Sequence, residues 1–289
     1  MQAHTPVLLD EVLQFLNPQP ASRFIDATLG AGGHASAILE RTSPDGRVLA
    51  IDQDEAAIER ARENLQFFGS RLEVVKANFR DIATVAGERG FLGADGILAD
   101  IGISSMLLDD AERGFSFMRE GQLDMRMNRD QELTADEVVN TYGEKEIADI
   151  LFNLGEERRS RAIARSIVRA RPLETTTDLV RAVQRVMGAP RYGKIHPATR
   201  TFQALRIHVN DELGSLEAFL DASMSVVRPA GRLAVISFHS LEDRIVKNRF
   251  RAPVVAGRVL TRKVVTATDE ELRRNPRARS AKLRVWERA

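Results

Sequence analysis

The sequence contains no cysteine in its 289 residues. Without thiols, a disulfide framework, a thiolate metal site and a cysteine nucleophile are all excluded. Apolar runs are short as well, and none approaches the ~18–20 residues that a membrane-spanning helix needs. His4, Asp10 and Glu11 interrupt the stretch in which a signal peptide would have its apolar core. These absences predict a soluble, cytoplasmic protein that does not act in a membrane.

Lysine is also scarce, since only six of the 42 cationic residues are Lys and the rest are Arg. The net charge of +1 hides an asymmetry, because residues 1–157 carry a net charge of −15 and residues 158–289 carry +16. The planar guanidinium of Arg suits phosphate recognition better than the point charge of Lys. A segregated basic half favours a polyanionic partner. A solvated surface, or a bias in genomic base composition, produces the same pattern.

The first hundred residues alternate between strand and helix patterns. We predict strands at residues 23–28, 46–52, 72–75 and 96–100, with helical spacing of the apolar residues between them. This alternation is typical of βαβ units and a parallel sheet, whose ligands bind beyond the carboxyl ends of the strands. Four residues with useful chemistry map to that edge, namely Asp26, Asp52, Phe79 and Asp100.

The middle of the chain has a different character. Between residues 113 and 208 no strand pattern occurs, and four helices are predicted. One opens with a capping box at residues 134–137, and the others lie at 144–153, 156–171 and 177–187. The α/β pattern then resumes with a helix at 211–227, a turn at 229–231 and a strand at 232–238, and strand candidates follow at 259–265 and 281–287. We therefore expect a discontinuous α/β domain of residues 1–110 and 209–289, with an inserted helical domain of residues 111–208.

A glycine-rich loop follows the first predicted strand. Gly30-Ala-Gly-Gly-His-Ala35 satisfies the dinucleotide fingerprint, and Asp52 ends the next strand, where a carboxylate can bind both hydroxyls of an adenosine ribose. NAD and S-adenosylmethionine both present such a ribose. Asp26 favours S-adenosylmethionine, because a carboxylate there repels a pyrophosphate but can help to hold an aminoacyl group. One alternative is an NAD-dependent oxidoreductase. Another, simpler alternative is that these glycines only form a tight turn and bind no cofactor.

Two further features extend this edge of the sheet. Phe79 follows the third strand, where it can stack on an adenine ring or serve as an ordinary core aromatic. The segment Asp100-Ile-Gly-Ile-Ser-Ser105 combines an acid, a glycine for close backbone approach and two hydroxyls. That combination suits the place where a substrate meets its cofactor, although a structural turn would look the same.

Several long motifs then occur in a fixed order along the chain. They are His4-Thr-Pro-Val-Leu-Leu-Asp-Glu11, Asp26-Ala-Thr-Leu-Gly-Ala-Gly-Gly-His34, Asp100-Ile-Gly-Ile-Ser-Ser105, Leu108-Asp-Asp-Ala-Glu-Arg-Gly-Phe-Ser-Phe117, Leu123-Asp-Met-Arg-Met127, His196-Pro-Ala-Thr-Arg-Thr-Phe-Gln-Ala-Leu-Arg206, Ser237-Phe-His-Ser-Leu-Glu-Asp-Arg244 and Asn275-Pro-Arg-Ala-Arg-Ser280. In these motifs the sequence closely resembles the bacterial 16S rRNA cytosine-N4 methyltransferases.

The resemblance implies a Rossmann-like class I S-adenosylmethionine methyltransferase sheet with an inserted all-helical, substrate-recognition domain. It implies methylation of a cytosine N4 amine in the decoding region (P site) of 16S rRNA, within the small ribosomal subunit. By matching motifs, the cofactor contacts fall on Gly32, Gly33, His34, Asp52, Phe79 and Asp100. The sequence departs from the usual pattern of this family in two places. Leu107 occupies a position where the family usually has Gln, and the segment between Phe250 and Asn275 is shorter than is usual in the family.

The chemistry of the reaction narrows the catalytic candidates. The N4 lone pair of cytosine is delocalised into the ring, so the enzyme must align the amine and supply acceptors for its N–H groups, and no metal is needed. Asp100 is the first candidate acceptor, with the hydroxyls of Ser104 and Ser105 second. His239 is a further candidate, but it equally suits a helix-entry turn. The target cytosine must be unpaired or splayed out of its helix.

Basic residues form two further groups. Arg158, Arg161, Arg165 and Arg169 share one face of a predicted helix, and four arginines lie near the C-terminus, at 273, 274, 277 and 279. Either group can follow a phosphate backbone or form a solvated surface. A non-catalytic RNA-binding or assembly factor on a methyltransferase scaffold is a third hypothesis, which only Leu107 favours. Both a monomer and a homodimer remain open.

Overall fold

The computed structural model describes residues 6–289, except for the side chain of Ser105. His4 and Thr5 of the N-terminal motif therefore lie outside the described residues. The chain divides into two compact units, here called the sheet unit (Met1–Gly102 with Leu213–Ala289) and the helical unit (Ile103–Glu212). The sequence places the two junctions after residues 110 and 208, whereas the compact units change after Gly102 and Glu212.

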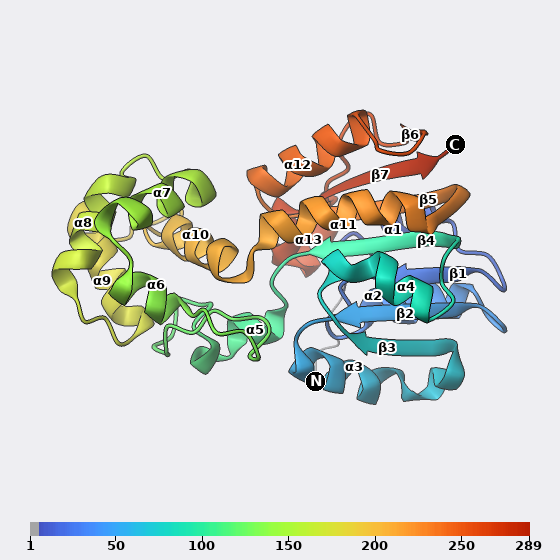
Figure 1. Cartoon of the computed structure of the whole chain (residues 1–289), viewed down its shortest axis with the longest axis horizontal. Coiled ribbons are helices and arrows are strands. Elements are labelled where there is room, and N and C mark those ends of the chain that lie inside the picture. Colours follow the sequence, from blue (N-terminus) through green and yellow to red (C-terminus); the bar gives the residue numbers. More distant parts are fainter. Residues whose placement is uncertain (1–5) are drawn as a thin grey trace. The chain divides into compact units, whose positions relative to one another are not determined.

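The sheet unit is built on a seven-stranded sheet in the order β3-β2-β1-β4-β5-β7-β6 (Figure 1). Its first five strands in that order are parallel, while β7 runs antiparallel to β5 and β6 antiparallel to β7. The strands are β1 (Arg23–Asp26), β2 (Arg47–Asp52), β3 (Leu72–Lys76), β4 (Ala94–Ile101), β5 (Val227–Ser237), β6 (Gly257–Val259) and β7 (Lys282–Arg288).

The register brings three acids to one edge of this sheet. Asp26 pairs with Ala50 of β2 and with Leu98 of β4, so the carboxyl ends of these three adjacent strands are nearly level. Asp52 ends β2, and Asp100 lies one residue before the end of β4. Because parallel strands point the same way, residues far apart in the sequence meet at this edge.

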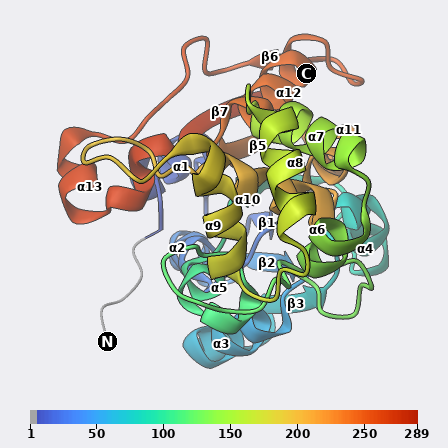
Figure 2. The same cartoon turned by 90° about the vertical axis from the view of Figure 1, so that its left-hand side faces the viewer.

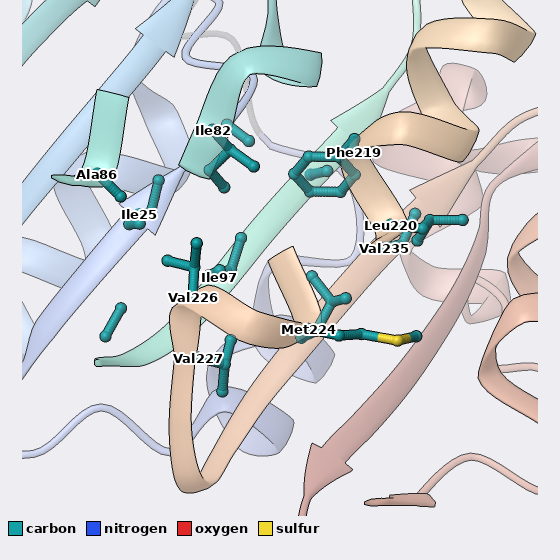
Figure 3. Close-up of a cluster of buried hydrophobic side chains, with 14 of the residues drawn as sticks. Ile25, Ile82, Ala86, Ile97, Phe219, Leu220, Met224, Val226, Val227 and Val235 are labelled. Atoms are coloured by element: carbon teal, nitrogen blue, oxygen red, sulfur yellow. The ribbon is translucent and has the colours of Figure 1, made fainter. Parts of the chain in front are cut away.

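Alternation along the strands creates two apolar faces. Phe24 of β1 and Leu98 of β4 belong to the core cluster that the first three helices cover, whereas Ile25 and Ile97 belong to the opposite cluster. The first face is covered by α1 (Leu9–Leu16), α2 (Gly33–Arg41) and α3 (Glu55–Leu65). The second face, shown in Figure 3, is covered by α4 (Ile82–Glu88), α11 (Glu212–Val226) and α12 (Ser240–Arg251). The last helix of this unit is α13 (Asp269–Arg274).

The helical unit has its own hydrophobic core and no strand among its described residues. Its helices are α5 (Ser105–Asp109), α6 (Ala135–Thr141), α7 (Glu144–Gly155), α8 (Ser160–Ala170), α9 (Thr176–Met187) and α10 (Thr199–Asn210). Packing of α7 against α8 and α10, and of α8 against α9, forms the centre of the unit (Figure 2). Thr134 and Thr175 cap α6 and α9 by accepting backbone N–H groups of the first helical turn.

Most of the predicted elements are confirmed, but one helix is not predicted and one strand ends earlier than predicted. The sequence pattern does not predict the helix α10, because Thr and Arg dilute its apolar positions. The strand expected at 259–265 ends at Val259, and beyond it Val265 makes only an isolated bridge to Leu283. Asp54 is the N-cap residue of α3, and its side chain makes no capping hydrogen bond. No helix in the described part of the chain combines the length and apolar character needed to cross a membrane.

A substitution at Phe219 tests how much the hydrophobic core below the carboxyl edge of the sheet contributes to stability. Its ring is fully buried between α11 and the sheet (Figure 3). Phe219→Ala should lower the free energy of unfolding by about 3–5 kcal/mol, because it removes a large apolar side chain and leaves a cavity. Urea unfolding followed by circular dichroism measures the change. Phe67→Ala, at a Phe that is 71% exposed, is the matched control and should change the free energy of unfolding little. Equal effects of the two variants would contradict this account of the core.

Candidate active site

The glycine-rich loop joins β1 to α2 at the carboxyl edge of the sheet. Gly30 and Gly32 have φ values of +52° and +87°, in the left-handed region that favours glycine. A Cβ on Gly32 would lie 2.6 Å from Leu65 Cδ1, and one on Gly33 would lie 2.5 Å from Pro6 Cγ. No described atom lies within 4 Å of the position of a Cβ on Gly30. Gly32 and Gly33 therefore permit close packing, while the backbone at Gly30 stays open to a ligand.

Asp52 ties this loop to the neighbouring strand. Its Oδ2 accepts the backbone N–H of Gly30 at 2.8 Å, and its Oδ1 accepts the backbone N–H of Asp54 at 2.9 Å. Burial raises the pKa of Asp52 above its ordinary value. A carboxylate offers about four lone-pair positions, so two hydrogen bonds leave capacity for two more donors. Asp52 is thus oriented by the backbone and able to accept a pair of hydroxyls.

Asp26 and Asp100 each keep one carboxylate oxygen without a hydrogen-bond partner among the described residues. Asp26 is 1% exposed, and its Oδ1 accepts the backbone N–H of Thr28 at 3.2 Å. Asp26 Oδ2 and Asp100 Oδ1 are both buried and accept no hydrogen bond from the described residues. In a folded protein, buried polar atoms of this kind usually have a partner, so unpartnered ones indicate a ligand.

The electrostatics of the pair follow from burial. Burial raises the pKa of Asp26 to about 7, and the nearby charge of Asp52 adds to this effect. Burial also raises the pKa of Asp100 to about 7, with contributions from the charges of Asp26 and Glu242. His34, in the first turn of α2, approaches Asp100 with its Nε2 3.8 Å from Oδ2. The site is therefore strongly acidic and favours a ligand that carries positive charge.

Glu242 was not singled out from the sequence, although it is one of the most buried acids of the sheet unit at 1% exposed. Its Oε2 accepts the backbone N–H groups of Phe238 and His239 at 2.8 and 3.1 Å, where β5 turns into α12. His239 in turn accepts the backbone N–H of Glu242 on its Nδ1. The spacing His-x-x-Glu after a predicted strand was the signal available, because it is a variant of the capping box. His239 thus has the helix-entry role that the sequence left open.

Phe79 begins η2 (Phe79–Asp81), directly after β3. Its ring is half-buried and meets the ring of Phe219 edge-on, with centroids 5.1 Å apart. The preceding Asn78 donates its side-chain amide to Gln53 Oε1 at 3.2 Å, which links this turn to the end of β2. The core role of Phe79 is confirmed, and its stacking on adenine stays a prediction.

The predicted hydroxyls belong to the helical unit. Ser104 is the N-cap of α5, and its Oγ accepts the backbone N–H of Leu107 at 3.3 Å. The side chain of Ser105 lies outside the described part of the structure. Leu107 is 5% exposed and belongs to the core of the helical unit, which accounts for an apolar residue at this position. Ser104 therefore has a structural role, and the catalytic roles of Ser104 and Ser105 stay predictions.

This set of donors and acceptors fits S-adenosylmethionine better than a dinucleotide. The unpartnered oxygens of Asp26 and Asp100 can accept an ammonium group, and Asp52 can accept the hydroxyls of a ribose. A pyrophosphate placed here would meet carboxylates, which are acceptors only when ionised. The open backbone at Gly30 and the partly exposed ring of Phe79 leave room for the rest of the nucleoside.

Comparison with known proteins agrees with this interpretation. The model of the MraW methylase family matches residues 1–289. A ribosomal RNA small subunit methyltransferase H from Dehalococcoides mccartyi is 47% identical over 302 residues, covering 99% of this chain and 86% of its own length. Its counterpart from Crocosphaera subtropica is 51% identical over 287 residues, covering 99% of this chain and 89% of its own.

Among solved structures, the crystal structure of PH0851 covers 99% of this chain and 46% of its own, with 12% identity and a TM-score of 0.50. This similarity concerns the fold, which is the Rossmann-like class I methyltransferase fold that the sequence predicts. S-adenosylmethionine is the cofactor. The alternative of an NAD-dependent oxidoreductase is therefore wrong. It arose because both classes of enzyme can carry the same glycine fingerprint.

Asp52 provides the first test of the site. Asp52→Asn retains one acceptor for the loop but loses the charge-assisted hydrogen bonds to hydroxyl donors, so the affinity for S-adenosylmethionine should fall roughly 10–100-fold. Isothermal titration calorimetry measures the affinity. Asp45→Asn, at an exposed acid in the turn before β2, is the control and should bind normally. Unchanged affinity in a folded Asp52→Asn protein would remove this residue from the binding site.

The raised pKa values predict how stability depends on pH. Because Asp26 and Asp100 have pKa values of about 7, above the ordinary 3.8, the folded protein binds more protons than the unfolded chain between those values. The free energy of unfolding of the ligand-free protein should therefore fall as the pH rises from about 4 to about 7. Urea unfolding at several pH values measures this trend, and Asp26→Asn should flatten it. An equally steep trend in that variant would show that other groups cause it.

Proposed function

The chain belongs to the MraW methylase family, and we propose that it transfers a methyl group from S-adenosylmethionine to the N4 amine of a cytosine in the P site of 16S rRNA. The relatives named as ribosomal RNA small subunit methyltransferase H align over almost the whole chain, which supports ribosomal RNA as the substrate. The observation that carries the chemistry is Asp100, an acid near the end of β4 whose side chain is 25% exposed and whose Oδ1 is buried without a partner among the described residues. The proposed substrate form is the small ribosomal subunit in the cytoplasm.

Cofactor binding is assigned to residues of the sheet unit. When bound, S-adenosylmethionine supplies a methyl group on a positively charged sulfur. Asp52, oriented by the N–H groups of Gly30 and Asp54, accepts the ribose hydroxyls. Asp26 Oδ2 accepts the amino group of the aminoacyl end. Gly32, Gly33 and His34 form the start of α2 beside the ligand, and Phe79 contacts the adenine.

Asp100 acts on the amine of the substrate. Its ionised Oδ1 accepts an N4–H of the cytosine, which localises the nitrogen lone pair and orients it toward the methyl group. Transfer would break the bond between the methyl carbon and the cofactor sulfur as the N–C bond forms, so that a neutral thioether leaves and the nitrogen must lose one proton. A carboxylate with a pKa of about 7 is able to take that proton at neutral pH. The separate acceptor on Asp26 resolves the difficulty that Asp100 would otherwise serve both cofactor and substrate. Ser104 and Ser105 are further acceptors by their place in the sequence.

The helical unit is proposed to recognise the RNA. Arg161, Arg165 and Arg169 lie exposed on α8, and Arg158 lies exposed just before it. Arg165 forms an ion pair with Glu144 at 3.3 Å, on a surface where such pairs contribute little. These guanidinium groups can therefore exchange water for phosphate oxygens of the RNA backbone.

The experiment is methyl transfer to small ribosomal subunits from cells that lack this protein. Methyl-tritiated S-adenosylmethionine reports transfer, and mass spectrometry of the nucleosides should detect N4-methylcytidine. Asp100→Asn should lower kcat by about 10²–10⁴-fold, the usual contribution of a positioned acid or base, while the fold is retained. Asp45→Asn again serves as the control.

Each other outcome contradicts a defined part of the proposal. Methylation of a different atom would overturn the N4 assignment but leave the enzyme class intact. Binding of S-adenosylmethionine without any transfer would favour the non-catalytic assembly factor. Near-normal turnover by a folded Asp100→Asn protein would remove Asp100 from the mechanism.

A further inference from the structure

A cavity of about 200 Å³ lies in the sheet unit, beside the antiparallel end of the sheet. The cavity, here called the basic pocket, is formed by the second half of α12, by β6 with the residues that follow it, and by β7. Its lining residues are Lys247, Phe250, Arg251, Val259, Thr261, Arg262 and Arg284. Four of these are cationic and none is acidic, so the pocket favours an anion.

One of the four cations is already neutralised. Arg284 forms a bidentate pair with Asp243, with distances of 2.7 and 3.2 Å between the nitrogens and the carboxylate oxygens. In the part of the chain that the structure describes, no carboxylate pairs with Lys247, Arg251 or Arg262. These three cations therefore leave an uncompensated positive charge around the cavity.

The remaining lining residues suit a tetrahedral oxyanion. Thr261 is 3% exposed, and its Oγ1 accepts the backbone N–H of Val285 at 2.9 Å. A hydroxyl can donate one hydrogen bond while it accepts another, so Thr261 retains a proton that it can donate into the pocket. Phe250 and Val259 form an apolar wall, which excludes water and strengthens hydrogen bonds to charged groups. Arginine forks, one lysine and one hydroxyl together match the oxygens of a phosphate.

We propose that the basic pocket binds a phosphodiester group of the RNA strand whose base is methylated. The inference rests on the proposed function for the nature of the RNA. The helix α12 connects the acidic edge of the sheet with the basic pocket. Glu242 lies in its first turn, at the acidic edge, and Lys247 and Arg251 lie in its second half. At 1.5 Å per residue, Lys247 lies about 10 Å and Arg251 about 16 Å along the helix from Ser240. A phosphate held there belongs to a nucleotide near the target, and it sets the register of the strand.

The double variant Arg251→Gln/Arg262→Gln tests the pocket, because both side chains are exposed and their loss should not disturb folding. Fluorescence anisotropy of a fluorescein-labelled single-stranded RNA measures binding over a range of salt concentrations. We expect about tenfold weaker binding, and a salt dependence whose logarithmic slope falls by about 0.7 for each lost phosphate contact. The affinity for S-adenosylmethionine should not change. Arg41→Gln, at an exposed arginine at the end of α2, is the control and should bind RNA normally.

The outcomes separate this inference from the proposed function, because RNA binding is measured without methyl transfer. Weaker binding with a smaller salt slope supports the pocket even if the wild-type protein transfers no methyl group. In a wild-type protein that does methylate, a raised KM for small subunits with unchanged kcat supports it further. An unchanged affinity and slope in the double variant would overturn it. Loss of inorganic phosphate binding in the double variant, with RNA binding intact, would mean that the pocket takes a free anion, and would also overturn it.

Discussion

The burial of several carboxyl groups at one edge of the sheet is the constraint on which the site depends. Asp26, Asp52 and Asp100 lie at the carboxyl ends of three adjacent parallel strands, and Glu242 follows the next one. Buried charges of one sign are costly unless hydrogen bonds or opposite charges compensate them. Backbone N–H groups orient Asp52 and Glu242, while Asp26 and Asp100 keep unpartnered oxygens and have pKa values raised to about 7. Under the proposed function, the positive charge of S-adenosylmethionine supplies the missing compensation.

The same interactions that stabilise the fold also prepare the site. The hydrogen bond from Gly30 to Asp52 holds the glycine-rich loop against β2 and orients the carboxylate. Glu242 joins the end of β5 to the first turn of α12 and adds negative charge near Asp100. From that turn, α12 continues to the basic pocket. The sheet unit therefore has an acidic edge suited to the cofactor and, farther along α12, a basic pocket suited to phosphate.

Local patterns predict much of this arrangement. The period-two strands, the glycine fingerprint and the acids at strand ends are short-range features, so the sequence alone places Asp26, Asp52 and Asp100 at one edge of the sheet. The helical unit is recognisable by the absence of strand patterns. The helix α10 is not predicted from such patterns, because polar residues separate most of its apolar ones, and in the structure it packs against α7.

The order of the elements, the family and the residue types at the site all follow from the amino-acid sequence. The hydrogen-bond and ion-pair partners of those residues follow only from the folded chain. The unpartnered oxygen of Asp26, the burial of Glu242, the capping role of Ser104 and the pair formed by Arg284 with Asp243 all depend on groups brought together by folding. The reason is physical: desolvation and hydrogen bonding depend on three-dimensional surroundings, and sequence spacing specifies those surroundings only within a single helix, strand or turn.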